Sequence, residues 1–166
     1  MKRSYVGSVA ALLALILTAG IAEAQVHWNV GGRLGLSIVT ASYGGVSGTS
    51  AGLQVGPAAE VIFGKQIAIG TEFDINTQSG TPIEWGTMFK YYFLIPGSKI
   101  LPYADAGVGL LFLTGGPYFG IRFGGGALFP IAHNLYIPAD VQLGPVFVTG
   151  TTAFFIEITS GVRYFI

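Results

Sequence analysis

The chain has 166 residues, enough for one domain, and it is poor in charge: hydrophobic residues make up 51% of it and charged residues only 10%. A soluble globular domain carries roughly 25% charged residues, so this composition does not suit a surface that meets water on all sides. The formal net charge is zero, which argues against a nucleic-acid-binding protein. The absence of cysteine excludes disulfides, thiolate metal sites and a thiol nucleophile.

The start of the chain has the features of a secretory signal peptide. An apolar stretch follows Lys2 and Arg3 and ends in Ala-Glu-Ala at 22–24, which places small residues where a signal peptidase reads them. A retained membrane helix is the alternative, but the apolar run is shorter than the roughly 20 residues that span a bilayer. We therefore predict a signal peptide over 1–24 and an exported domain over 25–166.

After this segment, apolar residues alternate with polar or small ones in stretches separated by turn residues. Alternation of this kind is typical of strands with one apolar face, and no stretch has the period of a helix over a useful length. The stretch 154–166 shows it best, because Ile156, Ile158 and Val162 share one face while Glu157 and Arg163 lie on the other. We predict a polar Gly/Ser loop over 40–51 and eight strands, over 28–39, 52–63, 67–75, 83–93, 101–113, 118–129, 135–148 and 154–166.

The charged residues indicate which face of these strands meets water. After the signal peptide, all seven acidic residues and four of the six basic ones lie opposite the apolar face, while Lys65 and Lys99 fall in turns. An Arg or Lys that faces hydrocarbon costs about 2–4 kcal/mol at the bilayer midplane, whereas charges inside a closed barrel can pair. We predict lipid outside and a structural charge network in the lumen, formed by Arg33, Glu60, Glu72, Asp74, Glu84, Lys90, Asp105, Arg122, Asp140, Glu157 and Arg163.

A soluble β-sandwich or a lipocalin-like barrel would also alternate. Such a protein would gather the apolar residues inside and would leave only eleven strand charges, interleaved with many glycines, to face water. An eight-stranded barrel has just enough interior for side chains to fill it, which suits these glycines and charges better.

Large aromatic residues fall at two levels along the expected strands. Aromatic side chains favour the lipid–water boundaries, so two rings of them are typical of a membrane barrel. We predict an aromatic girdle formed by Trp28, Phe63, Trp85, Phe93, Phe112, Phe129, Phe147 and Tyr164.

Taken together, the signal peptide, the eight alternating strands and the aromatic-rich last strand resemble the small OmpA- and OmpX-type outer-membrane barrels of Gram-negative bacteria. The resemblance covers 28–166 and implies an all-β fold, an eight-stranded antiparallel up-and-down transmembrane β-barrel. It also implies location in the cell outer membrane, contact with outer-membrane lipid, and insertion by the barrel-assembly machinery. In that family the assembly signal is a terminal aromatic preceded by alternate apolar residues. Val162, Tyr164 and Ile166 stand at those positions here, and Ile166 departs from the usual Phe.

Catalytic, metal and cofactor chemistry finds little support. His27 and His133 are far apart and both lie outside the expected strands, so they do not supply the three or four converging ligands of a metal site. The Gly124–Gly126 run is not followed by a helix and is not a phosphate loop. We expect no enzyme and no cofactor. Pro57, Pro138 and Pro145 each remove a ladder donor within a strand, and we expect bulges there.

Three functions remain open. The first is a structural envelope role for a monomeric barrel with a plugged polar lumen. The second is a narrow passive pore with weak cation preference, because seven inward acids exceed four inward bases. The third is a surface adhesin or receptor that would act through the loop 40–51.

Overall fold

The computed structural model of the chain describes residues 26–43, 46–78, 80–113, 115–148 and 150–166. The predicted signal peptide lies outside the described residues. Within them, no helix is long and apolar enough to cross a membrane.

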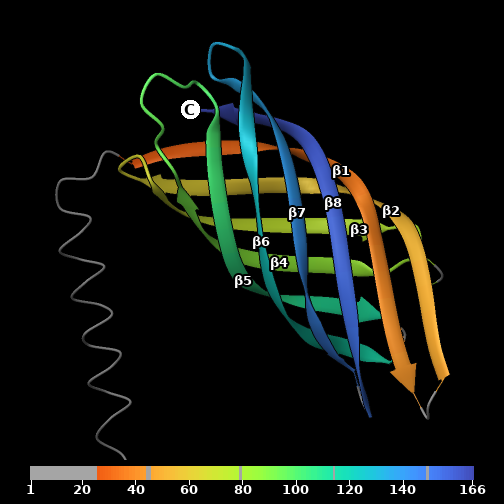
Figure 1. Ribbon diagram of the computed structural model, residues 1–166. Helices are drawn as coiled ribbons and strands as arrows, with labels where there is room; N and C mark the ends of the chain where they lie inside the picture. Colours follow the sequence, from red (N-terminus) through yellow and green to blue (C-terminus); the bar gives the residue numbers. More distant parts are fainter. Residues whose placement is uncertain (1–25, 44–45, 79, 114, 149) are drawn as a thin grey trace, which may run out of the picture.

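The described chain forms one closed antiparallel barrel of eight strands, as the alternation predicted (Figure 1). Each strand pairs with the next, and the first pairs with the last, so the sheet has no open side. The strands are β1 Val26–Tyr43, β2 Val46–Phe63, β3 Ile67–Asn76, β4 Ile83–Tyr92, β5 Leu101–Leu113, β6 Gly116–Ala132, β7 Leu135–Val148 and β8 Thr151–Phe165.

The side chains alternate across the barrel wall as the charges indicated. In β8, the Glu157 side chain is completely buried and Phe155 is 2% exposed, whereas Ile158 is 53% exposed on the exterior. Closure against β1 runs without a break from Asn29 opposite Phe165 to Ala41 opposite Ala153. The apolar face of the ribbon is therefore the outside of the barrel, and its polar face is the inside.

The prediction of a loop over 40–51 is wrong. Residues 40–43 extend β1 and residues 46–51 extend β2, so that Thr40 lies opposite Thr49 and Ser42 opposite Ser47 in a long hairpin. The paired hydroxyl oxygens are 3.1 Å apart for the threonines and 2.7 Å apart for the serines. Backbone pairing along β1 therefore orders a segment whose small, polar side chains have no apolar alternation to predict a strand.

The bulges expected at Pro57, Pro138 and Pro145 are absent from the ladders of the described strands. The ladder between β2 and β3 leaves out 56–57 and resumes in the same register. The missing donor of Pro57 therefore interrupts the pairing of the two strands but inserts no extra residue, as a bulge would. The one register shift between these described strands lies between Pro130 and Ala132.

The two rims of the barrel differ. At one rim, the amide of Ile166 donates to the carbonyl oxygen of Trp28 at 2.8 Å, and the short β2–β3 and β6–β7 turns lie at the same level. We call this the N/C rim. At the other end, β1 and β2 run on past the ends of β3 and β4 (Figure 1), and we call this end the hairpin rim.

Close backbone approach at Gly144 leads to a first prediction. A Cβ placed on Gly144 would collide with the carbonyl oxygen of Ile121 on β6, whereas a Cβ on Gly48 would meet open space. We expect Gly144→Val to lower the free energy of unfolding in detergent by about 1–3 kcal/mol, the usual cost of overpacking. Gly48→Val is the matched control and should change it little. Equal stability of the two variants in urea titrations would contradict this packing.

Candidate functional site

The lumen holds every residue of the predicted charge network. All eleven side chains are buried, and the most exposed, Asp140, has 9% of its surface accessible. They come from all eight strands, so the barrel wall brings together residues that are far apart in the sequence. The lumen is therefore the candidate functional site.

Arg33 of β1 is the cation with the most acidic neighbours. Its guanidinium pairs with the carboxylate of Glu72, and it lies 3.2 Å from Asp74 Oδ2 and 3.5 Å from Glu157 Oε2. The carboxylate of Asp140 is more distant, at 4.0 Å. A buried guanidinium must be paired to offset its lost hydration, and these acids from three other strands do so.

Glu157 of β8 joins this cluster to a second arginine. Its other oxygen, Oε1, accepts a hydrogen bond from Arg122 Nη2 at 2.7 Å, and Arg122 also lies 3.4 Å from Glu84 Oε2. Glu157 therefore bridges Arg33 and Arg122 across the lumen. Since it has no exposure to solvent, both of its ionic contacts are made in a setting of low dielectric.

Glu60 of β2 is the centre of a third group. Its carboxylate accepts hydrogen bonds from Lys90 Nζ at 2.5 Å, Tyr92 Oη at 2.7 Å and Asn29 Nδ2 at 2.8 Å. Lys90 also lies 3.7 Å from Glu72, which connects this group to that of Arg33. One network therefore crosses the lumen through β1, β2, β3, β4, β6, β7 and β8.

Arg163 and Asp105 are the least engaged of the predicted residues. Arg163 Nη2 lies 3.8 Å from Glu72 Oε1, and its Nη1 has no hydrogen-bond partner among the described residues. Both carboxylate oxygens of Asp105 also lack a hydrogen-bond partner there. The lumen has more acids than bases, and Asp105 is an acid that no base of the network pairs with.

Apolar side chains, which were not predicted from the sequence, close the lumen on both sides of the charges. Their signal was present, because aromatic residues interrupt the charged faces of β4, β7 and β8 near the strand ends. The N/C plug consists of Ile62, Ala68, Tyr92, Tyr103 and Leu128, packed by Leu101, Tyr136 and Phe165. The hairpin plug consists of Leu111, Val146, Ala153 and Phe155, packed by Val39, Ala41, Leu113, Tyr118 and Val148.

Two cation–π contacts tie the charges to the plugs. Lys90 Nζ lies 4.9 Å from the ring centre of Tyr103 in the N/C plug. Arg122 Cζ lies 5.0 Å from the ring centre of Phe155 in the hairpin plug. A desolvated cation over an aromatic face is stabilised by about 2 kcal/mol, so the charged layer and both plugs support one another.

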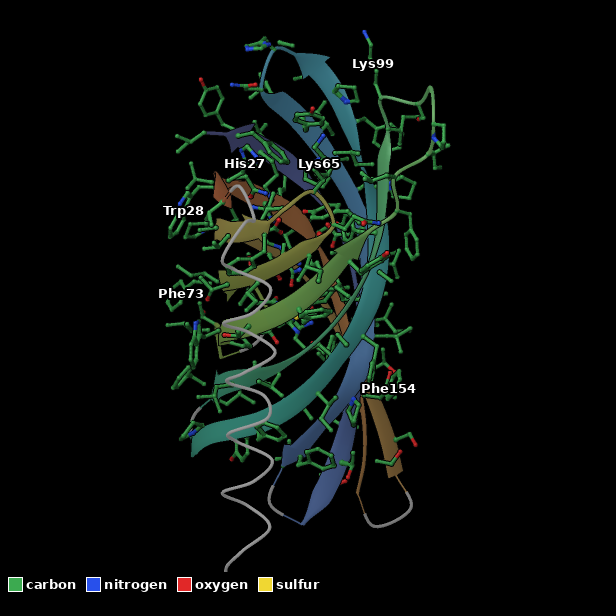
Figure 2. The ribbon with its side chains drawn as sticks, turned by 90° about the vertical axis from the view of Figure 1, so that its left-hand side faces the viewer. His27, Trp28, Lys65, Phe73, Lys99 and Phe154 are labelled. Atoms are coloured by element: carbon green, nitrogen blue, oxygen red, sulfur yellow. The ribbon has the colours of Figure 1, made fainter. Side chains whose placement is uncertain are left out.

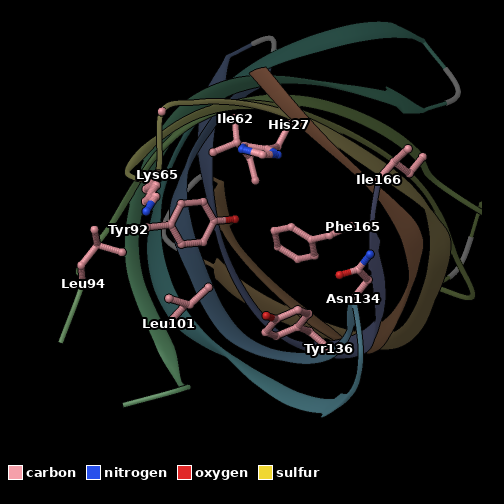
Figure 3. Close-up of a pocket in the computed structure, with 11 residues that line it drawn as sticks. His27, Ile62, Lys65, Tyr92, Leu94, Leu101, Asn134, Tyr136, Phe165 and Ile166 are labelled. Atoms are coloured by element: carbon pink, nitrogen blue, oxygen red, sulfur yellow. The ribbon is translucent and has the colours of Figure 1, made fainter. Parts of the chain in front are cut away.

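A cavity opens at each of the two mouths of the lumen. A cavity of about 350 Å³ at the N/C rim is lined by Tyr92, Tyr136 and Phe165, with Lys65 and His27 at its margin (Figure 3). A second cavity, of about 370 Å³, opens beneath the β1–β2 hairpin. There the Gln78 side chain donates to the carbonyl oxygen of Ser37 at 2.9 Å.

The predicted girdle residues lie on the exterior of the barrel, where Trp28 projects away from the strands (Figure 2). Seven of them are exposed and Phe63 is half-buried. The strand ladders place them at two levels: Trp28, Phe63, Phe93, Phe129 and Tyr164 near the N/C rim, and Trp85, Phe112 and Phe147 toward the hairpin rim. Phe147 stacks on Phe119 with ring centres 6.2 Å apart.

The predicted assembly residues Val162, Tyr164 and Ile166 are also exposed on the exterior. His27 and His133 lie at the N/C rim, outside the lumen network. Among the described residues, no group of three or more His, Cys, Asp or Glu side chains could hold a metal ion.

The fold of this chain is similar to that of several solved structures. No protein-family model matches the sequence, and no curated protein matches it. Neisserial surface protein A is similar in structure, with a TM-score of 0.61 at 15% identity over 82% of this chain and 96% of that chain. The N-terminal β-barrel domain of Pseudomonas aeruginosa OprF follows with a TM-score of 0.57 at 12% identity, over 81% of this chain and 97% of that one.

A designed transmembrane β-barrel is similar as well, with a TM-score of 0.52 at 13% identity over 82% of this chain and 96% of the other. The chain therefore has the fold of the small eight-stranded outer-membrane barrels, as the resemblance in its sequence implied.

The bridging position of Glu157 leads to a second prediction. Glu157→Gln keeps the shape of the side chain but leaves Arg33 and Arg122 short of a carboxylate in a buried site. We expect the free energy of unfolding to fall by about 3–5 kcal/mol, the cost of breaking a buried ion pair. Urea titration of the barrel in detergent, followed by tryptophan fluorescence, measures the change.

Glu84→Gln is the matched control for that experiment. Glu84 makes a single ion pair, with Arg122 at 3.4 Å, and Arg122 keeps its shorter bond to Glu157 in this variant. Its loss of stability should be clearly smaller. If Glu84→Gln destabilised the barrel as much as Glu157→Gln, the bridge would not be the centre of the network.

Proposed function

We propose that the protein is an integral outer-membrane barrel with a structural role in the envelope, and that its lumen is closed. The observation that carries the proposal is the layered interior, in which an ion-paired centre lies between two apolar plugs. A lumen filled in this way adds stiffness to the barrel and leaves no continuous path for solutes.

The exterior supports the membrane part of the proposal. Large apolar side chains from all eight strands are exposed there, whereas the charged residues of the strands are buried in the lumen. Such a surface is unfavourable in water and favourable in hydrocarbon. We infer export by the signal peptide, insertion through the β8 residues Val162, Tyr164 and Ile166, and a monomeric state in the lipid.

The layered lumen also favours this role over a pore. A pore needs water-accessible polar groups along its length, but the plugs place buried Tyr92, Leu128 and Phe155 across the path. The carboxylates that would give a cation preference are mostly engaged with Arg33, Lys90 and Arg122. We infer no enzymatic activity, since the buried acids lie behind these plugs, out of reach of a substrate.

Single-channel recording in planar bilayers tests the closed lumen. The refolded protein should give no conductance steps above those of protein-free bilayers, and gramicidin serves as the positive control for the bilayer. Heat-modifiability on a detergent gel confirms that the inserted protein is folded. Reproducible steps with a cation preference would replace the structural role with the passive pore.

The projecting β1–β2 hairpin favours a second candidate function, the binding of an external surface. It is ordered by cross-strand hydroxyl contacts, extends past β3 and β4, and carries no charged residue between Arg33 and Glu60. A stiff, neutral projection of this kind could contact another surface without electrostatic repulsion.

Shortening the hairpin separates the two functions. Replacing 42–47 by Asn-Gly keeps the pairing of Ala41 with Gly48 and supplies a two-residue turn. Under the structural role, cells that express this variant should adhere to glass and to cultured-cell monolayers as well as cells with the full hairpin do. A selective loss of adhesion, with the barrel still heat-modifiable, would instead establish the hairpin as an adhesive element.

A further inference from the structure

A cavity at the N/C rim lies between the segment that joins β4 to β5 and the turn that joins β6 to β7, and it borders the N/C plug at Leu101 and Tyr136. Its volume is about 720 Å³, and we call it the rim cavity. Its polar lining includes Lys99, His133, Asn134 and Tyr136, and no carboxylate contributes to it. No hydrogen bond or ion pair within the described residues uses the side chains of Lys99 or His133.

Local hydrogen bonds fix both walls of the rim cavity. Beside Lys99, the amide of Ser98 donates to the carbonyl oxygen of Ile95 at 3.1 Å, and the amide of Ile100 donates to Ser98 Oγ at 3.0 Å. On the other wall, the carbonyl oxygen of Asn134 accepts from the amide of Phe165 at 2.8 Å. The cavity is therefore held by backbone contacts.

Apolar side chains connect this cavity to the exterior of the barrel. Ile95 and Ile131 are 51% and 54% exposed, and Ile131 lines the cavity itself. They continue the exposed apolar surface past Phe93, where β4 has ended. An apolar surface that runs from the hydrocarbon zone to a cationic group matches an amphipathic molecule that lies along the barrel.

The distribution of charge specifies the polar end of that molecule. Among the described residues, the cations outside the lumen are Lys65 and Lys99, which both lie at the N/C rim, and every acid of the described strands is buried in the lumen. Lys99 lies at this end of the barrel in Figure 2, with its ammonium group directed away from the strands. Such a rim attracts anions and has no exposed carboxylate of a strand to repel them.

We propose that the rim cavity binds the phosphate headgroup of an anionic phospholipid, whose acyl chains run along the apolar exterior beside Ile131. The Lys99 ammonium, the His133 imidazole and the Asn134 amide supply donors to the phosphate. The apolar surface of Ile95 and Ile131 contacts the chains. This inference rests on the proposed membrane location, and it adds a leaflet preference, with the N/C rim in a phospholipid leaflet.

Native mass spectrometry of the barrel, released from nanodiscs of equal parts dioleoyl phosphatidylglycerol and dioleoyl phosphatidylethanolamine, tests the proposal. The unchanged chain should retain phosphatidylglycerol in preference to phosphatidylethanolamine. Lys99→Gln should reduce that preference about tenfold, as expected for the loss of a charge-assisted hydrogen bond. Addition of glycerol 1-phosphate should not displace the lipid, because a free headgroup lacks the apolar contacts.

Lys65→Gln is the matched control. It removes the same charge from the same rim but from a residue that does not line the rim cavity. The preference of this variant for phosphatidylglycerol should stay within about twofold of that of the unchanged chain, because salt screens an exposed charge that lies away from the bound headgroup. Equal losses in the two variants, displacement by glycerol 1-phosphate, or no preference in the unchanged chain would overturn the proposal. Failure to insert at all, seen as a lost gel shift, would instead contradict the proposed function.

Discussion

A backbone amide placed in hydrocarbon has no water to bond with, and each unsatisfied group costs several kcal/mol. Strands can meet this constraint only by closing on themselves, and here β1 pairs with β8 along thirteen consecutive positions. Closure leaves each strand with two faces, one toward the lipid and one toward the lumen. The position of every charge in the strands follows from that division.

Once the charges are inside, the narrow lumen must satisfy them. Glu157 and Glu60 act as centres that each collect donors from several strands, so the network links the wall across its own interior. The apolar plugs close the two mouths and keep these ion pairs in a setting of low dielectric, where their attraction is stronger. Lys65 and Lys99, the cations of the described residues that lie outside the lumen, are at one rim, which makes the two ends of the barrel chemically different.

The sequence predicted the strands, their number and the inward charges, because alternation is a local property that a membrane barrel must keep. It did not predict that 40–43 and 46–51 belong to strands, because their Thr and Ser residues form strands only by pairing with one another. Nor did it predict that Pro57 would leave the register unchanged, which depends on the partner strand. The plugs were missed because Tyr92 and Phe155 alternate like lumen residues, and their packing across the barrel is a tertiary property.

Spin labels along β8 test the central claim most directly, since the chain has no cysteine of its own. Single cysteines at consecutive positions 154–160 would be labelled, and the refolded barrels measured in lipid vesicles. We expect oxygen, which partitions into lipid, to reach labels at 154, 156 and 158, and neither oxygen nor a water-soluble nickel chelate to reach those at 155, 157 and 159. Contact of the nickel chelate with the odd-numbered labels, together with shielding of the even-numbered ones, would contradict the account.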